Sequence, residues 1–341
     1  MRFYFLALLC AMTAAAQSFH GTLRGQILDP GGHAVPIAKV TLIDEGTAVQ
    51  RATITSDQGE FTFASVTPST YQIIAEAPGF KRSERRNITV STQAAVTVDF
   101  KLEIGQVSEQ VNVTEEVPAL ETANASTGQV IDRQKLIDLP NLGRNPFMLS
   151  KLAENVVQVG NPKFNRMQDQ SGSSQISIAG GPVRGNNYTL DGISITDSTN
   201  RAVIIPSVEA VQEVKVQANT YDAEMGRTGG GTFNTFLRSG TNQLHGTLFS
   251  FSQNDILNAA PYRNTFDKKG VVRYWRGGAD IGGPVFIPKF LDKKRSKIYF
   301  FWSQEFQEQK VGYGSARTVR VPTDAERAGN FSGSLDVNNR L

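Results

Sequence analysis

The sequence from Thr22 to about Ile104 alternates between apolar and polar positions with the two-residue period of β-strands. Leu23 and Ile27, for example, alternate with Arg24 and Gln26, and clusters of Gly, Pro and Asp separate one run from the next. Short strands at roughly 8–12-residue spacing are typical of a β-sandwich. We therefore predict a sandwich with Phe61, Phe63 and Tyr71 in its core. The strands after the first are predicted at Ala38–Asp44, Ala48–Thr55, Glu60–Val66, Tyr71–Ala77, Asn87–Val90 and Ala95–Leu102.

The middle of the chain mixes helix and strand signals. Asp132 is a helix cap for Arg133–Leu139, and Pro140 ends that helix. A shorter helix is predicted at Val208–Val211. Together with three predicted strands, these segments indicate a compact α+β unit, and the strands are Asn187–Asp191, Val214–Gln217 and Thr232–Leu237.

From Leu244 onward the two-residue period returns in longer runs. Strands are predicted at Leu244–Asn254, Tyr274–Phe286 and Lys297–Gln307, with aromatic residues near their ends. A long polar connection, Asp255–Arg273, and a short one, Ile287–Ser296, join them. Strands of about ten residues with alternately long and short connections are typical of a transmembrane β-barrel.

Composition and charge place the chain in the globular class. It has 341 residues, of which 39% are hydrophobic, and a net charge of +3, which does not favour nucleic acid as a partner. The first sixteen residues combine Arg2, an apolar run over Phe3–Met12 and three alanines, which predicts a secretory signal. The single cysteine, Cys10, lies inside that signal, so the mature chain is expected to contain no disulfide.

A search for catalytic chemistry finds no constellation in the sequence. There is no P-loop, no G-x-S-x-G elbow and no H-E-x-x-H motif, and the histidines His20, His33 and His245 are widely separated. We therefore predict no enzyme, no catalytic residue, no bound metal and no cofactor. Asp191 and Asp197 are candidates for a Ca²⁺ site, but a turn-capping carboxylate is the favoured interpretation.

Residues spread over the predicted sandwich carry a first resemblance. The segment resembles the carboxypeptidase-regulatory-like domain, a transthyretin-like sandwich. That name does not imply peptidase activity, because the paired His and Glu ligands of a zinc peptidase are missing. The matching positions are Gly25, Asp29, Gly32, Pro36, Ala38, Val40, Asp57, Gly59, Phe61, Phe63, Val66, Tyr71, Ala77, Gly79 and Phe80.

A second resemblance rests on three motifs that follow one another in the middle of the chain. They are Asn187-Tyr188-Thr189-Leu190-Asp191-Gly192, Tyr221-Asp222-Ala223-Glu224-Met225-Gly226-Arg227 and Ser239-Gly240-Thr241-Asn242. They resemble the plug domain of TonB-dependent outer-membrane transporters, and the tail near Arg320-Val321-Pro322-Thr323 is similar to the Oar-like branch.

The second resemblance implies a function, a set of partners and a location. The expected function is TonB-dependent active uptake of a large solute across the bacterial outer membrane, gated by the plug and without covalent chemistry. The expected partners are the TonB–ExbB–ExbD complex, the outer membrane, and a carbohydrate, peptide or siderophore solute. The sandwich would then lie in the periplasm.

The same resemblance suggests sites. The TonB-contact candidate is the extended stretch Val111, Asn112, Val113, Thr114 and Glu115, for which a last sandwich strand plus linker is an equally good interpretation. Candidates for holding the plug in the barrel are Arg184, Glu224, Arg227 and Arg238, with ordinary surface pairs as the alternative. The plug motif itself comprises Asn187, Tyr188, Leu190, Asp191 and Gly192, and the segments expected to face the solute are Lys163–Gly185 and Ser194–Ile204.

The predicted organisation has five parts: a signal peptide (1–16), the sandwich (17–104), a linker with a possible TonB box (105–121), the plug (122–242) and the start of a barrel (243–341). The overall fold class is mainly β. Because barrels of this family have about 22 strands, the chain is expected to be a fragment or a truncated reading frame. If it naturally ends at Leu341, the alternative is a secreted or periplasmic β-sandwich that serves in binding or adhesion. A signal-transducing receptor is a further alternative, which the all-β pattern of the first domain disfavours.

Overall fold

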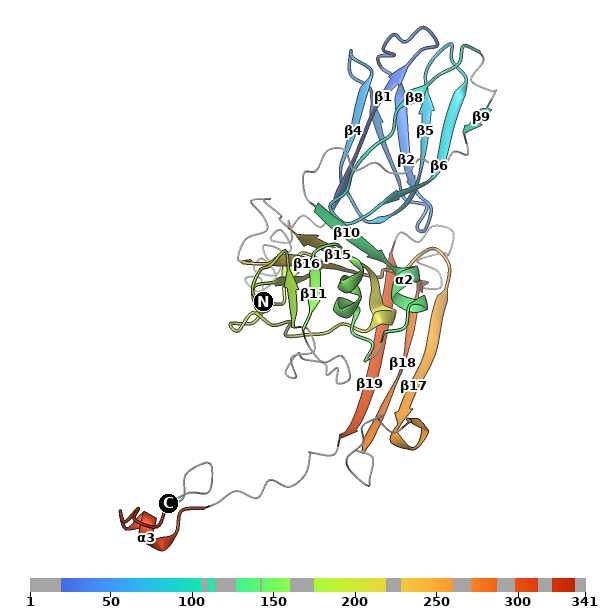
Figure 1. The fold of residues 1–341 in the computed structure, drawn as a ribbon. Coiled ribbons are helices and arrows are strands. Elements are labelled where there is room, and N and C mark those ends of the chain that lie inside the picture. The colour runs from blue at the N-terminus through green and yellow to red at the C-terminus, as the bar shows by residue number, and fades with distance from the viewer. Residues whose placement is uncertain are drawn as a thin grey trace, which may run out of the picture. The chain divides into compact units, whose positions relative to one another are not determined.

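The computed structural model describes residues 20–105, 110–113, 127–141, 143–159, 175–218, 228–259, 271–286, 298–311 and 321–334. Figure 1 shows a chain built mainly of β-strands, with a few short helices. The chain forms two compact units, one of Met1–Leu248 with Ala279–Glu305 and one of Phe249–Gly278 with Phe306–Leu341. The predicted signal peptide lies outside the described residues.

The first domain is a sandwich of two sheets. In one sheet, β1 (Gly21–Leu28) pairs antiparallel with β4 (Glu60–Val66) and parallel with β7 (Ala95–Thr97) and β8 (Phe100–Lys101). The second sheet has the order β3-β2-β5-β6-β9. Its strands, in that order, are Gln50–Ile54, Lys39–Asp44, Ser69–Glu76, Arg82–Val90 and Gln110–Val113.

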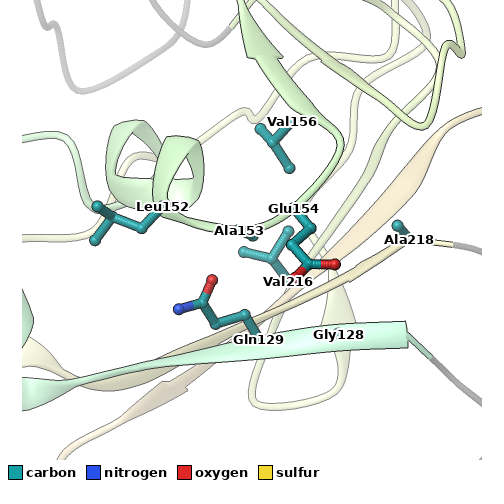
Figure 2. Close-up of a pocket in the computed structure, with 8 residues that line it drawn as sticks. All are labelled: Gly128, Gln129, Leu152, Ala153, Glu154, Val156, Val216 and Ala218. Carbon is teal, nitrogen blue, oxygen red and sulfur yellow. The ribbon is translucent and has the colours of Figure 1, made fainter.

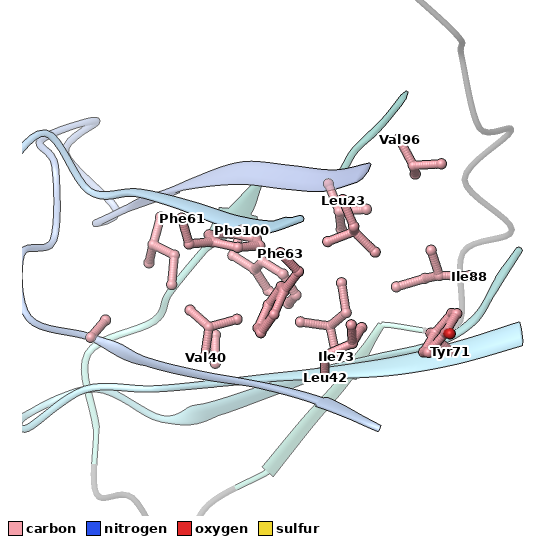
Figure 3. Packing of buried hydrophobic residues seen from close by; sticks show 14 of the residues in the cluster. Leu23, Val40, Leu42, Phe61, Phe63, Tyr71, Ile73, Ile88, Val96 and Phe100 are labelled. Atoms are coloured by element: carbon pink, nitrogen blue, oxygen red, sulfur yellow. The ribbon is translucent and has the colours of Figure 1, made fainter. Parts of the chain in front are cut away.

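The core of the sandwich is made by the inward-facing residues of both sheets (Figure 3). Phe61 packs against Phe63 and Phe100, with ring centroids 6.1 and 6.3 Å apart. The predicted core residues Phe61, Phe63 and Tyr71 are therefore confirmed as buried. Burying each large apolar side chain contributes roughly 1.5–3 kcal/mol to folding.

Two predicted sandwich strands differ from the observed ones. The run Ala95–Leu102 forms two short strands instead of one, because the Asp99 carboxylate accepts the Gln26 backbone N–H at 2.9 Å and interrupts the pairing with β1. Strand β6 begins at Arg82 and not at Asn87. Its first half carries charged residues, which hid the alternation from an apolar pattern search.

The second domain is the predicted α+β unit. Its sheet has the order β10-β15-β16-β13-β14, and β11 pairs with β12 in a separate two-stranded sheet. The helical elements are α2 (Arg133–Asp138) and two 3₁₀ turns, η2 (Pro146–Leu152) and η3 (Val208–Ala210). The strands are β10 (Thr127–Asp132), β11 (Val156–Gln158), β12 (Ile176–Ile178), β13 (Asn187–Leu190), β14 (Ile193–Ser194), β15 (Val211–Ala218) and β16 (Gly231–Leu237).

Three aromatic rings fill the centre of this unit. Tyr188 and Phe233 lie side by side on the parallel strands β13 and β16 and stack at 4.7 Å with an interplanar angle of 9°. Phe147, from η2, packs on both rings at 5.0 and 5.6 Å. The aromatic cluster therefore joins a sheet to the turn that covers it.

The predicted start of the helix in this domain is confirmed, whereas its predicted end is one residue too late. Asp132 is the N-cap, and its carboxylate accepts the Lys135 backbone N–H at 2.9 Å. The helix ends at Asp138, one residue before the predicted end. The strand β10, which precedes the helix directly, was not predicted, because Thr127–Asp132 contains few alternating apolar positions.

Three long strands follow the second domain. They are β17 (His245–Asn254), β18 (Val272–Pro284) and β19 (Tyr299–Val311), which form a sheet in that order. Their lengths of 10, 13 and 13 residues suit strands that cross a bilayer at a tilt. Two short helical segments complete the described elements, η4 (Asp255–Leu257) and α3 (Asp324–Arg327).

Large apolar side chains are exposed along these strands, among them Leu248, Trp302 and Phe306. A polar or charged residue is buried at two positions of β18, Arg276 and Asp280. Apolar residues that face outward, with polar residues that face inward, are the pattern of a barrel wall in lipid. Within the residues that the structure describes, no helix has the length and hydrophobicity needed to cross a membrane.

Candidate functional site

The Asp191-Gly192 pair makes the turn between β13 and β14. Both residues have positive φ angles, 47° and 81°. Two successive positive φ angles define a type I′ hairpin turn, for which Asp-Gly is a preferred sequence. The motif residues Leu190, Asp191 and Gly192 are therefore needed by the hairpin itself.

The carboxylate of Asp191 ties this hairpin to strand β16. It accepts the Leu237 backbone N–H at 2.9 Å, and the Asp191 backbone N–H donates to the Thr235 carbonyl at 2.9 Å. Burial raises the pKa of Asp191, and the hydrogen bond from Leu237 opposes that rise. Asp197 serves a separate turn, where it accepts the backbone N–H groups of Thr199 and Arg201.

The Asp197 carboxylate thus caps its own turn, whereas the Asp191 carboxylate bonds to the distant strand β16. Among the described residues, no group of three or more His, Cys, Asp or Glu side chains is placed to hold a metal ion. At the start of the motif, the Asn187 amide oxygen accepts hydroxyl groups from Ser194 at 3.1 Å and Thr196 at 2.7 Å. These bonds fix the loop that follows β14.

Arg238, the residue after β16, lies at the centre of a buried ionic cluster. Its guanidinium Nη1 donates to Asp280 Oδ1 at 2.9 Å and to the Glu209 carbonyl at 3.3 Å. The guanidinium also lies over the Phe301 ring, 4.9 Å from the centroid. The Arg238 and Asp280 side chains are 12% and 0% exposed, so the ion pair is almost completely excluded from solvent. All four residues belong to the same compact unit.

Glu209 is the second centre of the cluster. Its side chain is paired with Arg144 and accepts the Ser207 hydroxyl at 2.9 Å. Ser207 Oγ also lies 2.8 Å from the carboxylate of Glu305 on β19, so its single proton serves one of the two carboxylates at a time. Arg133 donates to the Glu209 carbonyl at 3.1 Å. We call these residues the ion-pair network: Arg133, Arg144, Ser207, Glu209, Arg238, Asp280 and Glu305.

The network contains three arginines and three carboxylates, so its formal charges cancel. Burial lowers the pKa of Arg133, the nearby Arg238 lowers it further, and Asp280 and Glu209 oppose both effects. Arginine nevertheless stays protonated in proteins. The second oxygen of Asp280, Oδ2, is buried and has no hydrogen-bond partner. Removing Arg238 would therefore leave a buried charge without compensation, which is strongly unfavourable.

The four plug-holding candidates have different positions. Arg238 lies inside the ion-pair network, whereas Arg184 is exposed on a turn after β12. Glu224 and Arg227 lie outside the described residues. The sequence did not predict Glu209 and Asp280 as ion-pair partners. A charged residue within a predicted barrel strand, such as Asp280, could have indicated a buried ion pair.

The TonB-contact candidates begin inside a strand of the sandwich. Val111, Asn112 and Val113 belong to β9, which pairs parallel to β6. Thr114 and Glu115 lie outside the described residues. The observed position of the first three residues corresponds to the edge strand that was the alternative interpretation of this segment.

Comparison with known proteins finds two matching domain families and a relative that aligns with most of this chain. The carboxypeptidase regulatory-like domain matches residues 22–103, and the outer membrane beta barrel domain matches residues 236–340. The chain is 25% identical, over 333 residues, to the TonB-dependent transporter Oar of Myxococcus xanthus. This chain is a homologue of Oar. The alignment covers 92% of this chain and 29% of Oar, so the chain spans less than a third of that relative.

Solved structures also resemble parts of this Oar homologue. The siderophore receptor PirA from Acinetobacter baumannii is 17% identical, with a TM-score of 0.36, over 54% of this chain and 24% of PirA. Catechol 1,2-dioxygenase from Pseudomonas arvilla C-1 is 13% identical, with a TM-score of 0.21, over 27% of this chain and 54% of the enzyme.

The Ser239-Gly240-Thr241-Asn242 motif of the Oar homologue has a steric explanation. A Cβ atom on Gly240 would lie 2.2 Å from the Phe300 carbonyl oxygen and 2.9 Å from that of Gly283. The backbone that leaves β16 therefore passes directly against strands β18 and β19. Only glycine allows this close approach.

A separate cavity of about 360 Å³ lies within the second domain (Figure 2). Gln129 on β10 faces the segment Leu152–Glu154 after η2, while Val216 and Ala218 come from β15. The lining provides one amide and one carboxylate among apolar groups, and it has no nucleophile paired with a base. Such a lining suits binding and not covalent chemistry.

Proposed function

We propose that this chain forms the periplasmic sandwich, the plug and the first barrel strands of a transporter. The transporter would take up a large polar solute across the bacterial outer membrane, with energy from the TonB–ExbB–ExbD complex. Support comes from homology to Oar over 92% of the chain and from the match of residues 236–340 to an outer membrane barrel domain. That homology favours a protein that moves a solute over an enzyme.

The ion-pair network is the observation that carries this proposal. It joins the plug side, through Arg144, Glu209 and Arg238, to Asp280 on β18 and Glu305 on β19. Hydrogen bonds between charged groups can be exchanged for hydrogen bonds to water when the plug moves. A purely apolar contact has no such replacement, because exposing it to water costs free energy in proportion to its area. A polar contact therefore suits a plug that must be both held and released.

Of the two segments proposed to face the solute, the loop Ser194–Ile204 is described along its whole length. A bridge between Thr196 and Ala202 closes it, and the Asp197 turn shapes its tip. Thr199, Asn200 and Arg201 near that tip bring a hydroxyl, an amide and a guanidinium. These groups suit hydrogen bonding to a carbohydrate, a peptide or a siderophore. For the other segment, Lys163–Gly185, the structure describes only residues 175–185.

Solute depletion by cells tests the proposal. A strain that expresses the natural protein containing this chain and its deletion strain would be incubated with mixtures of oligosaccharides, peptides and siderophores. Mass spectrometry would follow each solute in the medium. We expect at least one solute to be depleted only when the gene is present, and depletion to stop when a protonophore collapses the proton gradient. Equal depletion by both strains, or depletion that continues with the protonophore, would contradict the proposal.

A further inference from the structure

The last strand of the sandwich comes from the segment that the proposed function assigns to TonB contact. Strand β9 (Gln110–Val113) runs parallel to the first half of β6, with Ser83 opposite Val111 and Arg85 opposite Val113. Figure 1 shows β9 beside β6, and the sheet order places it at the end of the sheet. Three of the contact candidates therefore already have a strand partner in their own chain.

The chain before β9 is fastened next to the start of β6. Ile104 bridges to Phe80, and the Lys81 backbone N–H donates to the Glu103 carbonyl at 2.8 Å. The Gly105 backbone N–H donates to the Gly79 carbonyl at 3.2 Å. Because the segment is tethered beside the edge that it occupies, its effective concentration there is high.

The pairing of β9 is short compared with its neighbours. β9 covers four residues, whereas β6 has nine and pairs antiparallel with β5 over most of its length. Parallel pairing is also slightly less stable per residue than antiparallel pairing. These features make β9 the most easily released strand of the second sheet.

The side chains of β6 favour this occupant over a foreign strand. Arg82, Glu84 and Arg86 occupy every second position of β6. The buried Glu84 carboxylate forms ion pairs with both arginines. It also accepts a hydrogen bond from the Gln72 side-chain amide at 2.5 Å. Charged side chains along an edge strand oppose the addition of other chains. The sequence Gln110–Val113 has no charged residue, so it fits beside this charged strand without repulsion.

We propose that the β6 edge of the sandwich is a docking site for Gln110–Val113, and that docking there competes with the periplasmic partner for the same residues. The inference rests on the proposed function and gives the sandwich a role, as a store for the contact segment. Addition of a partner to the outer edge of β9 would leave β9 on β6, so the competition specifically predicts that the partner binds the segment only after β9 leaves β6.

An engineered disulfide tests the competition. Residues 17–341 contain no cysteine, so Ser83→Cys with Val111→Cys would provide the only thiols within them, and any cysteine elsewhere in the natural protein would be replaced by serine in every variant. Directly opposed residues on neighbouring strands lie within the Cα range of a disulfide. The matched control is Thr70→Cys with Thr89→Cys, which joins β5 to β6 and does not touch β9. Both variants would be made in the natural protein that contains this chain, purified from outer membranes.

Binding of the purified periplasmic domain of TonB from the same organism would be measured before and after reduction. We expect oxidation of the Ser83–Val111 variant to weaken binding at least tenfold and reduction to restore it, with no change in the control. If the disulfide does not form, the docking is wrong. Equal binding in both redox states would overturn the competition and leave the proposed function intact. Absence of binding in every variant and state would overturn the inference together with the proposed TonB partnership.

Discussion

Arg238 and Asp280 form a charged hydrogen bond of 2.9 Å in which the carboxylate is fully buried. Arg238 directly follows β16, and Asp280 lies within β18. A buried pair of this kind is weak evidence for net stability, because desolvation offsets the attraction between the charges. In the proposed plug, the pair would provide specificity, since a shifted plug would leave one or both charges unpaired.

Loss of one partner of this pair should be costly. We expect Arg238→Leu to destabilise the protein by about 3–5 kcal/mol, because it leaves Asp280 buried and uncompensated. Chemical denaturation of the detergent-solubilised protein would measure the change. The matched control is Arg327→Leu, which removes an exposed arginine that is 3.8 Å from Asp324 and should change stability by less than about 1 kcal/mol. Equal effects of the two substitutions would contradict a special role for the buried pair.

The hairpin carboxylate Asp191 gives a pH-dependent prediction. Burial raises its pKa in the folded state, so its contribution to stability is present below the pKa of the unfolded chain and is lost as the pH rises through the folded pKa. Asp191→Asn keeps an oxygen acceptor for the Leu237 N–H and tolerates the positive φ, but it carries no charge. Relative to wild type, the variant should therefore protect the Leu237 amide from hydrogen exchange better at pH 7 than at pH 4. A difference that is independent of pH would contradict this account.

The aromatic cluster should dominate the stability of the plug unit. Phe147 is fully buried against the stacked rings of Tyr188 and Phe233. We expect Phe147→Ala to cost about 3–5 kcal/mol, and Phe147→Leu less, because leucine fills part of the cavity. Hydrogen exchange of the β13 and β16 amides would report the loss. The control is Phe331→Ala at an exposed phenylalanine, and a similar loss of protection there would show that the effect is not due to the cluster.

Gly240 should not tolerate a side chain. Because a Cβ at this position would lie 2.2 Å from the Phe300 carbonyl oxygen, Gly240→Ala must displace the backbone at the start of the barrel strands. We expect a marked fall in the amount of folded, heat-modifiable protein in the outer membrane, measured by electrophoresis of unboiled samples. Gly333→Ala is the control, since a Cβ at Gly333 meets no atom within 4 Å. Normal assembly of the Gly240→Ala protein would contradict the close packing.

Local features of this fold were predictable from the sequence, and distant partners were not. The cap at Asp132 and the core position of Phe61 follow from signals within a few residues. The resemblance pointed to Arg238, but not to its partner Asp280, which is 42 residues away. The pairing of Arg144 with Glu209 spans 65 residues and depends on how η2 and η3 pack, which no local pattern encodes.

The start of β6 illustrates the same limit on a smaller scale. Its charged first half shows no alternation of apolar residues, and its strand conformation depends on β5 on one side and β9 on the other. The short strand β9 itself was as compatible with a linker as with a sheet edge. The strand conformation of such segments depends on the neighbouring strands with which they pair, so it cannot be predicted from their own sequence alone.

A reversible tether between the plug and the barrel tests the central claim most directly. The Ser207 hydroxyl lies 2.8 Å from the Glu305 carboxylate in the ion-pair network. Because cysteine is shorter than glutamate, Ser207→Cys with Glu305→Cys would be joined by a short bifunctional methanethiosulfonate reagent, whose disulfide links hold the proposed plug to β19. The measurement is uptake, by cells, of a solute whose depletion requires the gene, with and without a reductant. The account predicts that uptake stops when the crosslink is closed and returns on reduction, while each single cysteine variant behaves alike in both conditions. Uptake that continues at the full rate with the crosslink closed would contradict a plug that must move to let the solute pass.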